Sequence, residues 1–305
     1  MPPDFPDPVT VQAAGVRWRV LCVGPSGPGG MTGSTGATAP PDLLLLHGTG
    51  SSLHSWRRCL PGLALHFRVI VPDLPGHGGS SAFPDRQASL PRMAAAVAEL
   101  LQVLGSTPVL AAGHSAGAAV MAQLALDGRM PSLRGLLAVN GALEPLPGLM
   151  GLVAPTVARW ASRSELLPSW VTRHAAQPRA LGHLIASTGS RLDEAGVAHY
   201  RELLSQPAHV RGVLDMLAHW RLEALTARLP ALRMPLWLVA GLADRTTAPV
   251  RSLELSRQMK QGRFVPLKGL GHLAHEEAPA SINALLMELW GHTAAGAETA
   301  ADTAA

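Results

Sequence analysis

The feature that most constrains the fold of this chain is a series of short, uninterrupted apolar runs. The runs are LLLLH from residue 43, VIVPD from residue 69, PVLAAG from residue 108, LRGLLAVN from residue 133 and PLWLVAG from residue 235. Strands that are covered on both faces have this composition. Helix-like segments separate several of the runs, as crossovers between parallel strands require. We therefore predict an α/β protein with a mostly parallel, doubly wound sheet.

The longest interruption of this alternation is the segment 144–226. It contains the helix-like stretches LMGLVAPTVARWASR, PRALGHLIAS, DEAGVAHYRELLS and VRGVLDMLAHWRLEAL, and no convincing strand. Because the segment is too long for a simple crossover, we predict a helical lid inserted after the strand LLAVN. The core of the protein then comprises residues 1–143 and 227–292.

Three shorter segments have their own signatures. Residues 9–23 alternate apolar and polar side chains around Gly15, which predicts an antiparallel hairpin at a sheet edge. Residues 24–41 are rich in Gly, Pro, Ser and Thr, which predicts a flexible loop. Residues 293–305 carry no large apolar side chain, and we expect a disordered tail there.

Composition excludes several classes of protein. The net charge is +4 and the cationic side chains are scattered, so the chain lacks the basic stripe of a nucleic-acid-binding protein. It has no apolar run of about 18 residues, and its first residues hold acids and prolines, so we expect a cytoplasmic protein without a transmembrane segment. Cys22 and Cys59 indicate neither a disulfide framework nor a zinc site.

Ser115 lies in the pattern Gly113-His114-Ser115-Ala116-Gly117, between the apolar run VLAAG and the helix-like stretch AGAAVMAQLAL. This strand-turn-helix setting is the one that a nucleophile elbow requires. A serine at positive φ in so tight a turn needs small neighbours. The pattern therefore predicts that Ser115 is a catalytic nucleophile.

A serine nucleophile needs a base and an acid, which we expect after it in the order Ser, Asp, His. Asp244 follows the strand PLWLVAG, and His272 follows the short strand RFVPL. Because the carboxyl ends of parallel strands meet at one edge of a sheet, these side chains can converge on Ser115. His275 remains an alternative base and Glu144 an alternative acid.

The oxyanion hole is predicted from the stretch HGTGSS after the strand LLLL. Its small residues leave backbone N–H groups exposed, and the N–H groups of Thr49 and Ala116 form the natural pair. The Thr49 hydroxyl either adds a hydrogen bond or serves the turn. Such a site needs no cofactor, and we predict no metal ion, because His275-Glu276-Glu277 has no second histidine at zinc spacing.

Five motifs together resemble the α/β-hydrolase fold. They are HGTGSSLHSW, VPDLPGHGGS, GHSAGAAV, GLADRTTAP and GLGHLAHEEAP, in matching order over roughly residues 10–290. The resemblance implies an α/β-hydrolase core with a helical lid and a Ser115–His272–Asp244 triad. Asp73, in the second of these motifs, is interpreted as a structural turn residue.

Further stretches resemble the magnesium chelatase accessory proteins of bacteriochlorophyll synthesis, the BchO type. They are HGTGSSLHSWR, GHSAGAAVMAQLALDGR, LAVNGALEPLPG and the lid sequence TGSRLDEAGVAHYRELLSQPAHVRGVLDMLAHW. This resemblance implies a place near magnesium insertion, a small-molecule substrate such as a tetrapyrrole or its ester, and magnesium chelatase subunits as candidate partners.

The predicted lid carries aromatic side chains that either line an apolar substrate pocket or pack the lid helices together. The pocket candidates are Trp160, Trp170, Tyr200 and Trp220. Two hypotheses for the function therefore stand. The first is a serine hydrolase that cleaves an ester-like bond, and the second is a non-catalytic accessory protein that binds a tetrapyrrole or the chelatase.

Overall fold

An eight-stranded sheet forms the centre of the molecule in the computed structural model, which describes residues 6–25, 39–145, 160–175 and 177–302. The strand order is β1-β2-β4-β3-β5-β6-β7-β8, and all pairs are parallel except β1–β2 and β2–β4. The predicted doubly wound sheet and the edge hairpin are confirmed. The strands are β1 (Val9–Ala13), β2 (Val16–Val23), β3 (Asp42–Leu46), β4 (Arg68–Pro72), β5 (Leu110–His114), β6 (Gly135–Val139), β7 (Leu236–Gly241) and β8 (Gly262–Leu267).

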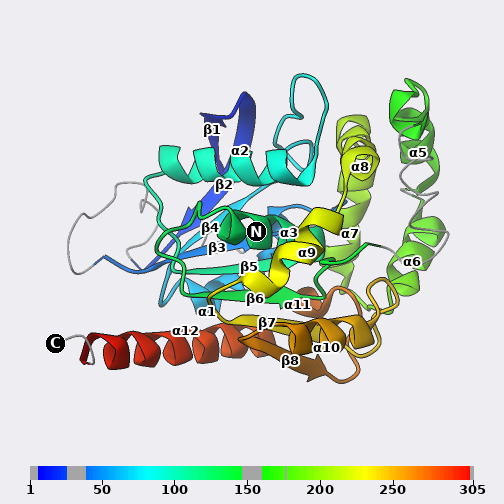
Figure 1. Ribbon diagram of the computed structural model, residues 1–305. Coiled ribbons are helices and arrows are strands. Elements are labelled where there is room, and N and C mark those ends of the chain that lie inside the picture. The colour runs from blue at the N-terminus through cyan, green and yellow to red at the C-terminus, as the bar shows by residue number, and fades with distance from the viewer. Residues whose placement is uncertain (1–5, 26–38, 146–159, 176, 303–305) are drawn as a thin grey trace.

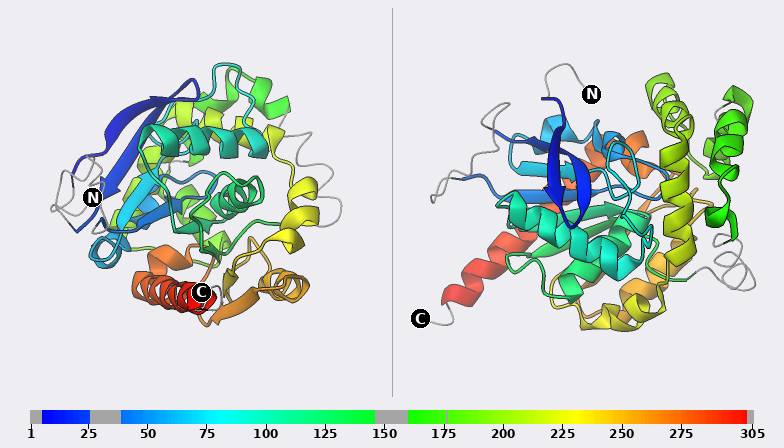
Figure 2. Two further views of the ribbon diagram at one scale, coloured as in Figure 1. Left: turned by 60° about the vertical axis from the view of Figure 1, so that its left-hand side comes forward. Right: turned by 90° about the horizontal axis from the view of Figure 1, so that it is seen from above.

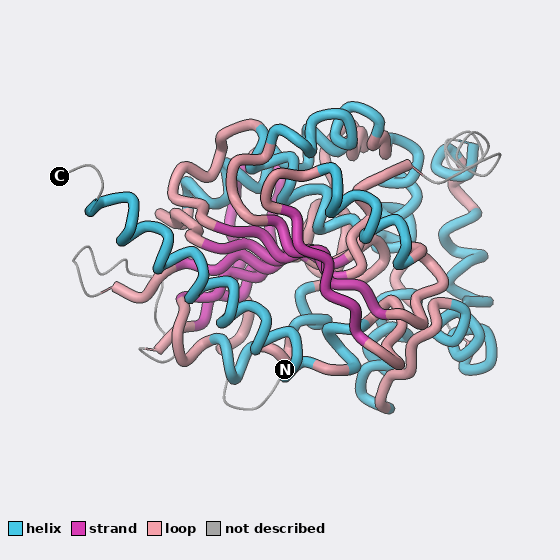
Figure 3. Tube along the Cα trace, turned by 60° about the horizontal axis from the view of Figure 1, so that its bottom comes forward, coloured by secondary structure: helices cyan, strands magenta, loops and turns pink. Residues whose placement is uncertain are grey.

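Helices cover both faces of the sheet (Figures 1 and 3). Alternate residues of a strand point to opposite faces, so Leu44 and Leu46 pack in one buried cluster while Leu43 and Leu45 pack in the other. The first cluster includes side chains of α2 and α3, and the second includes side chains of α1 and α12. The elements of this core are η1 (Leu53–Trp56), α1 (Leu60–Leu63), α2 (Leu90–Val103), α3 (Ala116–Leu126), η2 (Leu229–Ala231), α10 (Pro249–Gln258), α11 (Ala274–Glu277) and α12 (Pro279–Asp302).

The labelled α-helices α5 to α9 lie between β6 and β7, and we call them the inserted helices. They are α5 (Leu167–Ala175), α6 (Pro178–Ser187), α7 (Glu194–Leu204), α8 (Pro207–His219) and α9 (Glu223–Arg228). In Figures 1 and 2, α5 to α8 stand at one end of the sheet, and the C-terminal part of α12 extends from the other end.

The inserted helices differ in two ways from the sequence-based expectation. The stretch VRGVLDMLAHWRLEAL is two helices, because Trp220 is extended, with φ −75° and ψ 120°, and ends α8. α5 was not predicted. Most of the stretch LMGLVAPTVARWASR falls on residues 146–159, which lie outside the described residues.

The C-terminus also differs from the expectation. α12 runs to Asp302, so residues 293–302 are helical where the sequence predicted a disordered tail. This segment is rich in alanine, which has the highest intrinsic helix propensity, and it continues a helix that the core already holds. Of the predicted loop 24–41, residues 26–38 lie outside the described residues. Across the described part of the chain, none of the helices combines the length and the apolar character that crossing a membrane requires.

Candidate active site

Ser115 occupies the sharp turn between β5 and α3, with φ 50° and ψ −117°. Such a backbone conformation is strained for a residue other than glycine. Close packing explains the glycines on either side. A Cβ at Gly113 would lie 2.4 Å from the nitrogen of Ala118, and one at Gly117 would lie 2.4 Å from the carbonyl oxygen of Leu46. The turn therefore lifts Ser115 out of the sheet at the carboxyl end of β5.

Asp244 and His272 come together at the same end of the sheet, from the loops after β7 and β8. His272 Nδ1 lies 2.8 Å from Asp244 Oδ2, and both residues are buried. The carboxylate of Asp244 is fixed in turn, because it accepts hydrogen bonds from the backbone N–H groups of Thr246 and Thr247 and from the Thr247 hydroxyl. This arrangement orients the imidazole and leaves its Nε2 for chemistry.

The two alternatives to this pair are engaged elsewhere. Glu144 forms an ion pair with Arg251, with an N–O distance of 3.0 Å. His275 is fully buried, with its ring centroid 4.6 Å from that of Trp56 and 4.3 Å from that of His114. Burial lowers the pKa of His275 to about 3, and the positive charge of Arg57 adds to the shift. The histidine that is paired with the Asp244 carboxylate is therefore His272 and not His275.

Asn140, which the sequence analysis did not single out, holds the backbone of the loop between β8 and α11. We call this loop, residues 268–273, the histidine loop. Its Nδ2 donates to the carbonyl oxygens of Gly271 and His272 at 2.9 and 2.7 Å, and its Oδ1 accepts from the Gly241 N–H. His114 Nε2 also lies 2.9 Å from the His272 carbonyl oxygen. Asn140 has φ 46°, a region that asparagine tolerates, and its place at the end of the run LLAVN is the only sequence signal for this role.

Asp73 serves the loops around the site, as the sequence suggested, and His47 does the same. The buried Asp73 carboxylate accepts from the backbone N–H groups of Leu53 and Gly79. His47 Nε2 accepts from the Leu74 N–H, and its Nδ1 donates to a backbone carbonyl. Burial lowers the pKa of His47 to about 3, so this imidazole is neutral.

A cavity of about 1150 Å³ opens between the sheet and the inserted helices. Ser115, His272 and Asp244 all line it. Its volume lies slightly above the usual range for small-molecule sites, about 300 to 1,000 Å³. The opposite wall is apolar and comes from α5, α6, α7 and α8. Residues of this wall include Val171, Leu181, Ile185, Leu204, Val213 and Leu217.

Two of the four aromatic pocket candidates line this cavity and two do not. Tyr200 and Trp220 contribute to its wall. Trp160 and Trp170 lie outside it, with 75% and 57% of their surfaces exposed. Trp170 stacks on His174, which lies one turn further along the solvent-facing side of α5. The residue of α5 that lines the cavity is the smaller Val171. The expectation that Trp160 and Trp170 line the pocket is therefore corrected.

The two predicted oxyanion donors flank Ser115. A Cβ at Gly48 would lie 2.9 Å from Ser115 Cβ, so the loop that carries Thr49 passes directly against the serine. Ala116 is the first residue of α3, where backbone N–H groups have no helical acceptor. Thr49 and Ala116 both line the cavity. The Thr49 hydroxyl contacts the sulfur of Met216 on α8, at 3.5 Å.

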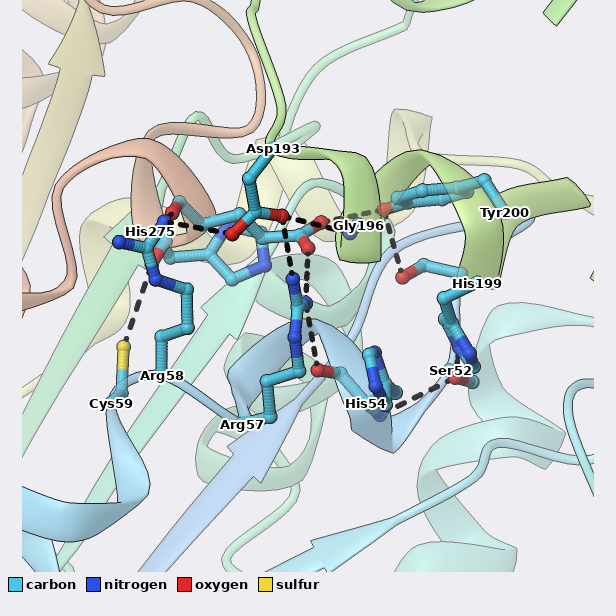
Figure 4. A network of polar contacts seen from close by, with 12 residues as sticks. Ser52, His54, Arg57, Arg58, Cys59, Asp193, Gly196, His199, Tyr200 and His275 are labelled. Carbon is cyan, nitrogen blue, oxygen red and sulfur yellow. Dashed lines mark hydrogen bonds and ion pairs between the residues drawn. The ribbon is translucent and has the colours of Figure 1, made fainter. Parts of the chain in front are cut away.

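A polar network that is buried except at Asp193 attaches α7 to the core beside the histidine loop (Figure 4). Arg57 pairs with Glu276 at 2.8 Å and with Asp193, the residue before α7, at 3.3 Å. The Tyr200 hydroxyl donates to Glu276 and lies 3.2 Å from the Ser51 hydroxyl. Burial raises the pKa of Tyr200, so the hydroxyl keeps its proton and remains a donor. The network holds one of the inserted helices over the cavity.

Known proteins resemble this chain in sequence and in structure. The chain is 40% identical to the magnesium-chelatase 30 kDa subunit of Rhodobacter capsulatus, over 90% of each protein. It is 30% identical to a pimeloyl-[acyl-carrier protein] methyl ester esterase of Aromatoleum aromaticum, over 78% of this chain and 94% of the relative.

The fold has relatives among solved structures. A thermophilic esterase from Thermogutta terrifontis superposes with a TM-score of 0.71 at 22% identity, covering 94% of this chain and 99% of the esterase. A family model described as alpha/beta hydrolase fold matches residues 41–279. That match includes Ser115, Asp244 and His272 and most of the sheet, and the chain therefore belongs to the α/β hydrolase fold family.

Proposed function

We propose that this protein is a serine hydrolase that cleaves an ester-like bond. The observation that carries the proposal is the buried His272–Asp244 pair, 2.8 Å apart, which lines one cavity with a serine in the strained turn of a nucleophile elbow. Membership of the α/β hydrolase family and the identity to an esterase support hydrolytic chemistry.

Each residue has a defined task in this reaction. Ser115 Oγ attacks the carbonyl carbon while His272 Nε2 takes the hydroxyl proton. Asp244 stabilises the imidazolium that forms, and the N–H groups of Thr49 and Ala116 bind the negative oxygen. His272 then returns the proton to the leaving alkoxide, and water releases the acyl group by the same steps. The reaction needs no metal ion or cofactor.

The shape of the cavity supports a substrate with a bulky apolar part. About 1150 Å³ of space lies under an apolar wall of inserted helices, which is more than a short methyl ester requires. The identity to a magnesium-chelatase subunit supports a role near the magnesium chelatase step of bacteriochlorophyll synthesis. A tetrapyrrole ester in the cytoplasm is the substrate that agrees both with the large apolar cavity and with a role near magnesium chelatase.

Covalent labelling with a fluorophosphonate probe tests the chemistry. The wild-type protein is expected to be labelled, and the Ser115→Ala and His272→Ala variants are expected to lose the label. Ser80→Ala, at a buried serine whose hydroxyl donates to the Asp73 carbonyl, is the matched control and should be labelled like the wild type. No label on correctly folded wild-type protein would refute an activated serine.

A second candidate function is a non-catalytic accessory protein that binds a tetrapyrrole or a magnesium chelatase subunit. The 40% identity to a magnesium-chelatase 30 kDa subunit favours it. Titration with protoporphyrin IX and pull-down of purified chelatase subunits distinguish the two functions. Binding that is unchanged in the Ser115→Ala variant, in a protein without probe labelling, supports the accessory role.

A further inference from the structure

The turn between α6 and α7, residues 188–191, reaches from the inserted helices to both loops that carry the His–Asp pair. The carbonyl oxygen of Thr188 accepts the backbone N–H of His272 at 3.2 Å and the backbone N–H of Arg245 at 3.3 Å. Arg245 follows Asp244 directly. A single carbonyl group between two of the inserted helices therefore joins the histidine loop to the loop that carries Asp244. We call this second loop, residues 242–248, the acid loop.

The next residues of the turn extend this connection. Ser190 is buried, and its hydroxyl accepts the Leu273 N–H at 2.7 Å. The Glu277 carboxylate accepts the Arg191 N–H with one oxygen and the Gly271 N–H with the other. The backbone N–H groups on both sides of His272 are thus satisfied from the α6–α7 turn or through Glu277.

The fit of the turn against the two loops is tight. Gly189 has φ +81°, and a Cβ there would lie 1.9 Å from the carbonyl oxygen of Ala243 in the acid loop. A Cβ at Gly271 would lie 2.3 Å from the carbonyl carbon of Gly189. Glycine at both positions allows the two backbones to touch.

We propose that the α6–α7 turn is a positioning element of the active site, and that Gly189 and Ser190 are its key residues. The core holds the carbonyl group of His272, through Asn140 and His114, whereas the inserted segment holds its N–H group. If the turn withdraws, the N–H groups of His272, Leu273 and Arg245 lose their acceptors, and the histidine loop is free to shift. The His272–Asp244 geometry is therefore set only while α6 and α7 lie over the cavity.

Two pairs of matched variants test this proposal. Gly189→Ala introduces a Cβ against the loop of Asp244, and Gly182→Ala introduces one on exposed α6, where no atom of the described residues lies within 4 Å. Ser190→Ala removes the acceptor of the Leu273 N–H, and Ser187→Ala removes an exposed hydroxyl that donates to the Leu184 carbonyl within α6. The readouts are the rate of fluorophosphonate labelling and the downfield proton resonance of His272 Nδ1–H, assigned with His272→Ala.

Gly189→Ala and Ser190→Ala are expected to slow labelling at least tenfold and to shift or abolish the resonance, whereas the two α6 variants stay within twofold of the wild type. Ser190→Ala keeps the test valid if Gly189→Ala does not fold. A resonance that is unchanged in both turn variants overturns the proposal. The labelling readout rests on the proposed hydrolase function. If the wild type is not labelled, that function fails, and the resonance still decides whether the turn positions His272.

Discussion

At the scale of single residues, the contacts of two carboxylates assign the acid of the active site. Asp244 holds His272, and Glu144 holds Arg251. We predict that Asp244→Asn slows labelling and turnover by about 100- to 10,000-fold, because the amide cannot stabilise the imidazolium or impose the right tautomer. Glu144→Gln should change both rates less than threefold. Rates measured at several pH values check this, and a larger loss in Glu144→Gln than in Asp244→Asn would reverse the assignment.

A second prediction at this scale concerns the packing of the nucleophile turn. Gly117→Ala places a Cβ 2.4 Å from the carbonyl oxygen of Leu46, which is backbone in the central strand β3 and cannot move aside. The free energy of unfolding should fall by about 1 to 3 kcal/mol, as in other overpacked cores. The matched change Gly291→Ala, on α12, meets no atom of the described residues within 4 Å and should gain about 0.5 to 1 kcal/mol from helix propensity. Urea unfolding of both variants measures the contrast.

At the scale of elements, the Tyr200 hydroxyl is one of the groups that attach α7 to the core. Tyr200→Phe removes its bonds to Glu276 and Ser51 and leaves the buried Glu276 carboxylate one donor short. We expect a loss of about 1 kcal/mol in the free energy of unfolding and faster deuterium exchange in α7. Trp170→Phe, on the exposed side of α5, is the control and should leave exchange in α7 unchanged. Equal exchange in both variants would remove Tyr200 from this attachment.

The elements that sequence reasoning predicted are those whose signal is local. The buried runs around LLLL and LWLVAG became β3 and β7, since continuous apolar composition marks strands covered on both faces. The break at Trp220 and the exposure of Trp170 depend on which face of a helix meets the core, and periodicity in a helical insertion does not determine this.

The candidate site likewise has residues that the sequence predicted and residues that it did not. Ser115, Asp244 and His272 follow strands, so topology alone brings them to one edge, although their catalytic roles remain predictions. The parts played by Asn140 and the α6–α7 turn rest on backbone contacts between segments that are distant in sequence. A hydrogen bond that uses a main-chain carbonyl, such as that of Thr188, has no residue-type signature, and only the folded chain reveals it.

At the scale of the whole molecule, seven histidines are kept neutral by full or partial burial. Burial is the main cause that lowers the pKa of each of them. The pKa falls to about 4 in His199 and His209, to about 3 in His47 and His275, to about 2 in His54, and well below its usual value in His77 and His114. In the unfolded chain the same side chains titrate near pH 6.5. Folding therefore excludes protons that the unfolded chain binds in mild acid.

The sign of this linkage predicts destabilisation by acid. A lowered pKa in the folded state contributes stability that is complete above about pH 6.5 and is lost as the pH falls toward the folded values. Asp73 and Glu276, whose pKa values burial raises, oppose the trend but are outnumbered. The melting temperature should fall by roughly 10 °C or more between pH 7.5 and pH 5.

His275→Phe isolates one contribution to this acid sensitivity, because both ring nitrogens of His275 are buried without a hydrogen-bond partner among the described residues. An apolar ring at this position binds no proton in either state. The difference in the free energy of unfolding between pH 7.5 and pH 5 should therefore shrink by about 2 kcal/mol, from 1.36 kcal/mol per pH unit below pH 6.5. His183→Phe, at an exposed histidine of α6, is the control and should keep the wild-type pH dependence. A wild-type melting temperature that stays constant from pH 7.5 to pH 5 would contradict the predicted acid destabilisation. If seven histidines are neutral in the folded protein and become charged on unfolding, the free energy of unfolding must fall as the pH falls.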